Sequence, residues 1–205
     1  MNKNSTEKKF SLTGIVMTIM VTIGLAWAAV QWQHRYDWPR PITDKEQEAN
    51  CIKVFKNLQL ICAAQDKYIQ KDWDNDGQKV YSRYLAHLWT TLSRQSDPIL
   101  IELIPKKLAF AMGPANDLEG YYFSDLPERA LDSKGNTRKN DYTKEWAIAA
   151  IDAAYTQTAG RVFLADNTGK ILMKYTTETP EIWPHDPPAN GWQVITAIEQ
   201  IKRQP

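Results

Sequence analysis

The chain has 205 residues, and its 25 Lys and Arg residues against 24 Asp and Glu residues give a formal net charge of +1. This length is sufficient for one domain with a hydrophobic core, and the eight Trp and nine Tyr residues argue against disorder. Charges of both signs are mixed along the chain, without the basic patch or stripe typical of nucleic-acid binding. We therefore expect no nucleic-acid partner.

The first distinctive segment, residues 10–32, contains no charged residue. A bilayer core about 30 Å thick needs about 20 apolar residues in a helix, so this segment is long enough to span it. Tryptophans at its end would lie in the aromatic belt at the membrane surface. The sequence predicts a single-pass transmembrane helix anchored in the bilayer by Phe10, Ile15, Ile19, Ile23, Trp27 and Trp32.

The flanking charges predict the orientation of this anchor. Residues 1–9 carry Lys3, Lys8 and Lys9 against Glu7, which predicts a cytoplasmic N-terminus and an exported remainder. The expected location is the bacterial inner membrane, with the C-terminal domain in the periplasm or elsewhere outside the cytoplasm. A secretory signal cleaved near Ala26-Trp27-Ala28 is the alternative, but the apolar stretch exceeds the usual signal core of about 7–15 residues.

Residues 33–43, which include Pro39-Arg40-Pro41, are predicted to be a linker, and residues 44–205 an exported domain. Thr43 and Glu46 match a capping box, so we expect a helix from there to about Lys71. Its apolar residues follow the i, i+3, i+4 spacing of one buried face. They are Cys51, Val54, Phe55, Leu58, Ile61, Cys62, Tyr68 and Ile69.

The two cysteines, Cys51 and Cys62, lie in this same predicted helix. Their separation along the helix axis would be roughly 16 Å. A disulfide requires Cα atoms within about 7 Å, so the two cannot be joined to each other there. We interpret them as buried apolar residues, and pairing with a cysteine of a partner chain remains the alternative.

An acidic turn follows the helix. Asp72, Asp74, Asp76 and Gly77 match positions 1, 3, 5 and 6 of an EF-hand loop, whose alternating oxygen ligands converge on calcium. Position 12, which should be Glu, is Arg83. The turn is therefore either a calcium site formed by the three aspartates and other oxygens of the fold, or a solvated turn that ends the helix.

The pattern predicts a second helix over residues 80–93, with an apolar stripe made by Tyr84, Leu85, Leu88, Trp89 and Leu92. Residues 94–119 contain short apolar runs broken by prolines and receive no assignment. From Gly120 the hydrophobic period changes from that of a helix to that of a strand. We expect strands at residues 121–126, 146–151, 161–166 and 170–175.

Connections between these strands favour an antiparallel meander. Residues 127–142 suit a long hairpin loop, and Asn167-Thr168-Gly169 a tight turn. Residues 191–203 fit either a short strand at 192–195 or a terminal helix, with a slight preference for the helix. The predicted fold class is α+β, with a transmembrane helix followed by amphipathic helices packed on a four-stranded antiparallel meander sheet.

This plan resembles the type IV pilins and pseudopilins of bacteria. The segments that carry the resemblance are Ala63-Ala64-Gln65 through Tyr68, the Asp74–Gly77 turn, Gly120–Phe123, Asp141-Tyr142, Trp146–Ala150, Thr158–Phe163 and Asp166–Ile171. They are equally similar to a related family of uncharacterised exported bacterial proteins. The likeness covers about residues 44–176 and implies a pilin-like fold and a structural role in a secretion or membrane assembly.

The N-terminus departs from the prepilin pattern. Lys9 precedes Phe10 where prepilins have Gly, and Gly14 stands at the fifth position where they have Glu. The residues for cleavage and filament assembly are thus absent. This departure favours a protein that keeps the fold as a plain anchored subunit.

No catalytic motif is present. His34, His87 and His185 lack the HExxH, CxxC and GxSxG contexts of common catalytic sites, and a Cys62–His87 pair would need spatial proximity. We therefore expect no enzymatic activity. Trp183, in a proline-rich segment, is either packed on the domain or offered to a partner.

The sequence is compatible with two functions. The first is a non-enzymatic, membrane-anchored, exported subunit of a larger membrane or secretion assembly, pseudopilin-like, which docks to other protein subunits. The second is a calcium- or peptide-binding module at the membrane surface. Calcium at Asp72, Asp74 and Asp76 is the only cofactor considered.

Overall fold

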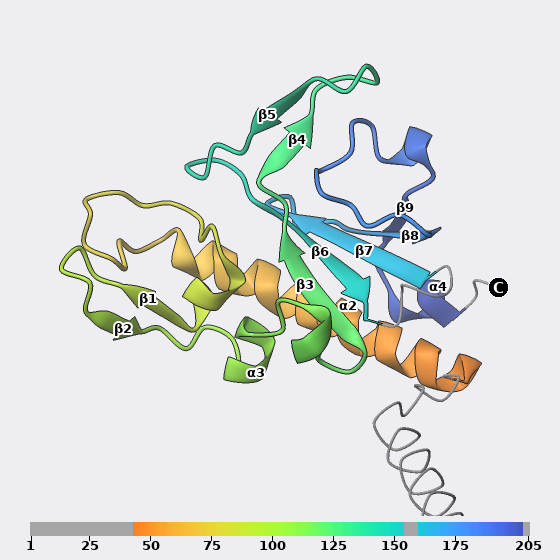
Figure 1. Cartoon of the computed structure of the whole chain (residues 1–205), viewed down its shortest axis with the longest axis horizontal. Coiled ribbons are helices and arrows are strands. Elements are labelled where there is room, and N and C mark those ends of the chain that lie inside the picture. Colours follow the sequence, from red (N-terminus) through yellow and green to blue (C-terminus); the bar gives the residue numbers. More distant parts are fainter. Residues whose placement is uncertain (1–42, 154–159, 203–205) are drawn as a thin grey trace, which may run out of the picture. The chain divides into compact units, whose positions relative to one another are not determined.

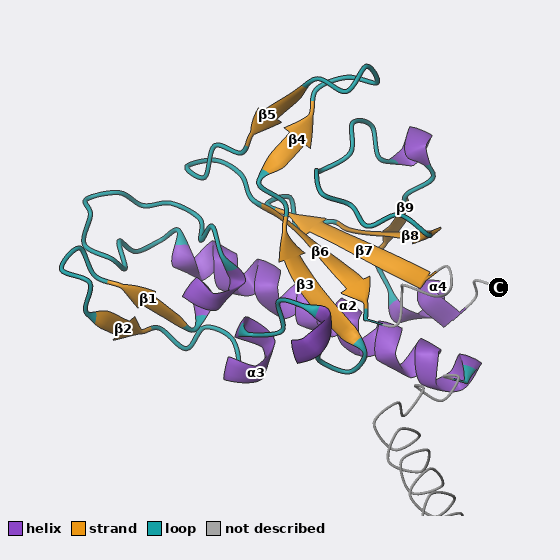
Figure 2. Ribbon diagram, in the orientation of Figure 1, coloured by secondary structure: helices purple, strands orange, loops and turns teal. Residues whose placement is uncertain are grey.

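The computed structural model describes residues 43–153 and 160–202. Within it, a long helix and a five-stranded sheet form the centre (Figures 1 and 2). The helix α2, Asp44–Tyr68, starts at the predicted capping box: the Glu46 N–H donates to Thr43 Oγ1 over 3.3 Å, and the Thr43 N–H donates to Glu46 Oε2 over 3.1 Å. The predicted helix start is confirmed, and its end lies a few residues before Lys71.

The central sheet is antiparallel, with the strand order β3-β6-β7-β8-β9. Its strands are β3, Tyr121–Asp125; β6, Ala147–Asp152; β7, Gly160–Asp166; β8, Ile171–Thr176; and β9, Gln193–Ile195. The four predicted strands are present within a residue or two, and β9 adds a fifth. Asp166–Gly169 forms the predicted tight turn, in which Gly169 adopts φ +70°.

Both faces of this sheet are buried, because successive side chains of its strands alternate between two apolar clusters. Phe163 and Ala165 of β7 point into the cluster that α2 covers, together with Leu58 and Ile61. Val162 and Leu164 point into the other cluster. That second cluster also contains Leu126, Trp183 and Trp192, so the segment after β8 covers the far face.

Two small hairpins accompany the central sheet (Figure 1). One pairs β1, Thr90–Leu92, with β2, Pro98–Leu100; the other pairs β4, Glu128–Ala130, with β5, Thr137–Lys139. The short helical elements are η1, Leu85–Leu88; α3, Lys106–Ala109; η2, Pro114–Asn116; η3, Pro188–Asn190; and α4, Ile198–Lys202. The C-terminal region thus contains both the strand and the helix that the sequence left as alternatives.

The predicted fold class is wrong. Among the described residues there is one long helix, and the predicted four-stranded meander is a five-stranded sheet accompanied by two two-stranded sheets. The predicted second helix at residues 80–93 is replaced by an extended segment, the single turn η1 and strand β1. The β-branched Thr90 and Thr91 favour a strand there. Within residues 127–142, predicted as a long hairpin loop between two strands, β4 and β5 form a hairpin of their own.

The predicted location is also corrected. Over residues 43–153 and 160–202, no helix is both long and apolar enough to cross a membrane. This finding conflicts with the predicted single-pass protein of the inner membrane and with its membrane anchor. The segment 10–32, with Phe10, Ile15, Ile19, Ile23, Trp27 and Trp32, lies outside the described residues.

Candidate functional site: an acidic turn beside a tyrosine-lined groove

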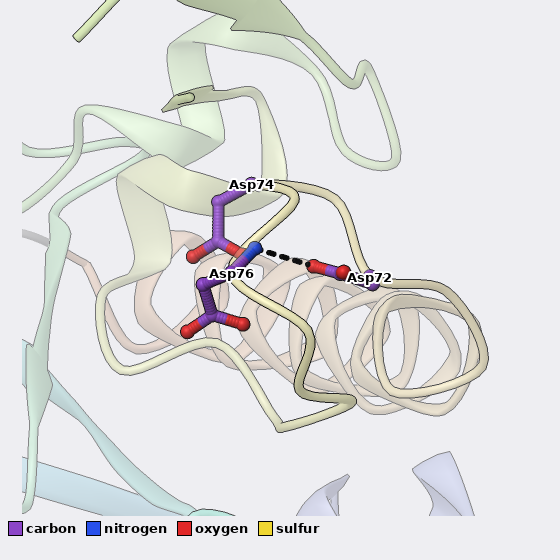
Figure 3. Close-up of side chains that lie close together, drawn as sticks. All are labelled: Asp72, Asp74 and Asp76. Atoms are coloured by element: carbon purple, nitrogen blue, oxygen red, sulfur yellow. Dashed lines mark hydrogen bonds between the residues drawn. The ribbon is translucent and has the colours of Figure 1, made fainter. Parts of the chain in front are cut away.

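The acidic turn begins directly after α2. Asp72 accepts two backbone hydrogen bonds, from the Asp76 N–H over 3.1 Å and from the Gly77 N–H over 3.0 Å. Asn75 and Gly77 adopt positive φ angles of 58° and 89°, which tighten the turn. Figure 3 shows the Asp74 and Asp76 side chains side by side, with the Asp72 carboxylate pointing toward the Asp76 backbone.

This geometry brings three carboxylates together. One oxygen each of Asp72, Asp74 and Asp76 lies within 4.8 Å of the others, as ligands of a single cation must. Burial, and then the charge of Asp76, raise the pKa of the Asp74 carboxyl. Arg83, at the position where an EF-hand has Glu, instead stacks on the Tyr142 ring at 5.3 Å, so it supplies no ligand.

The turn borders a cavity of about 540 Å³, and a second cavity of about 720 Å³ shares lining residues with it. Both are lined by Arg83, Tyr84, Asn140 and Tyr142, and we call the combined depression the tyrosine groove. Asp74, Asp76 and His87 lie in the smaller cavity, and Asp125 lies in the larger. Segments that are distant in sequence therefore form the groove: residues around 78–87 and 139–143 line both cavities, and Met112 and residues between 123 and 128 line the larger one.

Gln65 of α2 holds the first of these segments in place. Its side-chain amide accepts from the Ser82 N–H over 2.9 Å and donates to the Ser82 carbonyl over 3.1 Å. This pair of hydrogen bonds to the Ser82 backbone imitates the pairing of two strands, which explains why the chain is extended here rather than helical. The Tyr81 N–H then donates to the Tyr142 carbonyl over 2.8 Å and joins the two walls of the groove.

The second wall is fixed by Arg129 of β4, whose side chain is only 12 % exposed. Its guanidinium pairs with Glu145 at 3.2 Å and with Asp166 at 3.3 Å, and donates to Asn140 Oδ1 over 3.0 Å. The Asn140 amide in turn donates to the Leu126 carbonyl over 2.7 Å. Arg129 thereby ties the β4–β5 hairpin, the groove wall and the sheet together.

The same guanidinium also donates to the Trp146 carbonyl over 2.9 Å and lies 4.9 Å from the centre of the Trp183 ring. Trp183 is buried in the cluster on the far face of the sheet, so of its two interpretations the structure favours packing on the domain. We therefore give it no role in partner binding.

Aromatic side chains line both cavities of the groove, and Tyr84 is the exposed one among them. Tyr84 is 52 % exposed, and its ring meets the His87 ring edge-on at 5.1 Å. Burial lowers the pKa of the half-buried His87, which favours its neutral form. Tyrosines and arginines of this kind are enriched in protein interfaces.

Asp125, at the end of β3, is the most unusual acid of the groove. Its half-buried carboxylate lines the larger cavity and accepts a hydrogen bond from the Leu85 N–H. Burial raises its pKa to about 7. No pattern in the sequence distinguishes Asp125, Arg129 or Asn140, because their importance arises from contacts with residues far along the chain.

The considered Cys62–His87 pair is not formed. The thiol of Cys62 on α2 interacts electrostatically with Asp66 and Asp166, and burial raises its pKa to about 12. His87 instead contacts Tyr84 and is influenced by Asp74. Cys51 is buried near the Tyr121 hydroxyl, and both cysteines are free thiols.

Comparisons with protein-family models, with curated proteins and with solved structures found no match to this chain. The resemblance to pilins and pseudopilins therefore stays a prediction from the sequence.

Proposed function

We propose that this chain is a non-enzymatic docking subunit that binds a basic polypeptide segment of a partner protein in the tyrosine groove. The observation that carries this proposal is the charge of the groove. Its lining holds five carboxylates, those of Asp74, Asp76, Asp125, Glu128 and Asp141, against two cations, those of Arg83 and Lys139. This imbalance favours a positively charged occupant.

A polypeptide suits the groove better than an isolated cation does. Its two cavities share lining residues, and one of these is the exposed Tyr84. The Tyr84 ring offers an amphipathic contact to a side chain of the partner. The walls are held by backbone and side-chain bonds such as Tyr81 to Tyr142, so little ordering is needed on binding.

The test uses the purified full-length chain and a fluorescent hexalysine peptide, with binding followed by anisotropy over a salt series. We expect saturable binding that weakens with salt and becomes about tenfold weaker in Tyr84→Ala, since central tyrosines commonly contribute more than 1 kcal/mol. Tyr175→Ala is the matched control, because Tyr175 is 59 % exposed but lies on β8 outside the groove.

Spermine, a polyamine without a peptide backbone, serves as the competitor. Equal losses in the two tyrosine variants, or spermine binding as tightly as the peptide, would show that charge alone is recognised and would overturn the docking proposal.

A second function, calcium binding at the acidic turn, is favoured by the convergence of the Asp72, Asp74 and Asp76 oxygens within 4.8 Å. The three side chains would supply oxygen ligands, and the cation would neutralise carboxylates that now repel one another. The two functions are compatible, since Asp74 and Asp76 also line the groove.

Millimolar calcium chloride should raise the thermal unfolding midpoint of the full-length chain, because a ligand that binds only the folded state stabilises it. Asp74→Ala should abolish the rise while leaving intact the hydrogen bond from the Arg94 N–H to the residue 74 carbonyl. The exposed Asp97, outside the turn, provides the control Asp97→Ala. An unchanged midpoint in the wild-type chain would exclude this function.

A further inference from the structure

The carboxylate of Asp125 differs from the other well-buried acids of this domain. Asp166 and Glu145, whose side chains are 6 % and 14 % exposed, both pair with Arg129. None of the ion pairs found within residues 43–153 and 160–202 involves Asp125. Among the described residues the Leu85 N–H acts on this carboxylate as a hydrogen-bond donor, and acceptor capacity remains toward the larger cavity.

A half-buried carboxylate without a cation is costly to ionise, and burial accordingly raises the pKa of Asp125 to about 7. A cation placed in the cavity would remove most of this cost. The acid is therefore poised to gain more from a cationic ligand than an exposed acid such as Asp97 would.

The surroundings of Asp125 favour a guanidinium over an ammonium group. The cavity walls carry Tyr84, Tyr142 and the exposed Met112, which are apolar or aromatic surfaces. A guanidinium is less strongly hydrated than an ammonium and stacks on aromatic rings. Arg83 demonstrates this mode within the groove itself, since its guanidinium lies over the Tyr142 ring at 5.3 Å.

We infer that Asp125 anchors an arginine side chain of the docked segment, with the guanidinium on the carboxylate and the aliphatic stem between Tyr84 and Met112. This inference rests on the proposed docking function and specifies which residue of the partner the groove recognises. It would make an arginine bind more tightly than a lysine of the same charge.

Other charged groups around the larger cavity do not replace this anchor. Glu128 of β4 accepts a hydrogen bond from the Thr137 hydroxyl over 2.9 Å, and Arg83 is held on Tyr142. Lys139 of β5 lines the same cavity and is exposed to solvent. His87 lies in the smaller cavity, where burial lowers its pKa, and burial raises the phenol pKa of Tyr142.

The experiment compares fluorescent hexa-arginine and hexalysine peptides on the full-length chain at pH 8 and pH 6. Because the ionised fraction of a carboxyl with a pKa of about 7 falls about tenfold over this interval, hexa-arginine should bind about tenfold more weakly at pH 6. Asp125→Asn should bind hexa-arginine no more tightly than hexalysine, and its affinity should be nearly independent of pH. Asp97→Asn is the control and should behave as the wild-type chain does.

Asn is isosteric with Asp and retains an acceptor for the Leu85 N–H, so we expect Asp125→Asn to fold; its thermal unfolding checks this. The pH series on the unmodified chain tests the same inference without any substitution. Equal binding of the two peptides by the wild-type chain, or an unchanged preference in Asp125→Asn, would overturn the arginine anchor while the docking proposal stands. If neither peptide bound, both proposals would fail.

Discussion

Arg129 offers the sharpest test of how the groove wall is held. Arg129→Met removes the guanidinium but keeps much of the packing volume of the side chain. It leaves Asp166 and Glu145, 6 % and 14 % exposed, without their shared cation, and strips Asn140 and the Trp146 carbonyl of a donor. Breaking a buried ion pair by removing one partner costs about 3–5 kcal/mol.

Urea unfolding of the full-length chain, followed by Trp fluorescence, measures this loss. With a slope of about 2 kcal/mol per molar urea, a loss of about 4 kcal/mol lowers the midpoint by about 2 M. Arg138→Met is the matched control, because Arg138 also pairs with Glu145 but its side chain is 44 % exposed, so its midpoint should shift far less. Equal shifts in the two variants would refute the claim that Arg129 holds the wall.

Four further predictions concern local features of the fold. Thr43→Ala removes the N-cap oxygen of α2 and should lower the free energy of unfolding by about 1 kcal/mol in urea titrations. Gly169→Ala should lower the free energy of unfolding by about 1–2 kcal/mol, because φ is +70° at this position. No atom lies within 4 Å of the added Cβ, so the cost comes from the backbone conformation. The control Gly113→Ala, at a φ of −176°, should lower the free energy of unfolding less. Cys62, with a pKa of about 12, and the buried Cys51 should resist iodoacetamide at pH 8 until the chain is unfolded, and rapid labelling of the folded chain, read by mass spectrometry, would contradict this. Because the pKa of Asp125 is raised to about 7 in the folded chain, its ionisation opposes folding, so stability should fall as pH rises from 4 to 7; Asp125→Asn should flatten this part of the pH profile of the unfolding midpoint.

The parts of the fold that the sequence predicted correctly depend on neighbouring residues. The capping box of Thr43 and Glu46 marks the start of α2, and the Asp166–Gly169 turn needs only residues that adjoin in the chain. In β6 and β7 successive side chains alternate between the two faces of the sheet, and this pattern is equally local, although both faces are buried. In each case the residues that predict the element are the same residues that form it.

The errors arise where distant residues decide the conformation. Tyr84 and Leu88 have helical spacing, but Gln65 fixes Ser82 in an extended strand-like bond, and the helix cannot form. β9 joins the sheet beside β8 only after a long excursion of the chain. Tertiary contacts of this kind override local propensity.

The candidate site was predicted only in part. The acidic turn was evident as the aspartates at positions 72, 74 and 76, because these three residues lie within one short segment of the sequence. The tyrosine groove was not evident from the sequence. Tyr84 and Tyr142 are far apart along the chain, and the Tyr81–Tyr142 hydrogen bond and the network around Arg129 bring their segments together. The raised pKa of Asp125 is caused by burial, which cannot be read from a single sequence.

Hydrogen–deuterium exchange with and without hexa-arginine tests the central claim, that the tyrosine groove is the docking surface, most directly. We predict slower exchange in peptic fragments that cover residues 78–87 and 139–143, including the Tyr81 amide that joins the walls, and unchanged exchange in fragments that cover β8. Protection confined to other parts of the chain, or no protection at a saturating peptide concentration, would contradict the account.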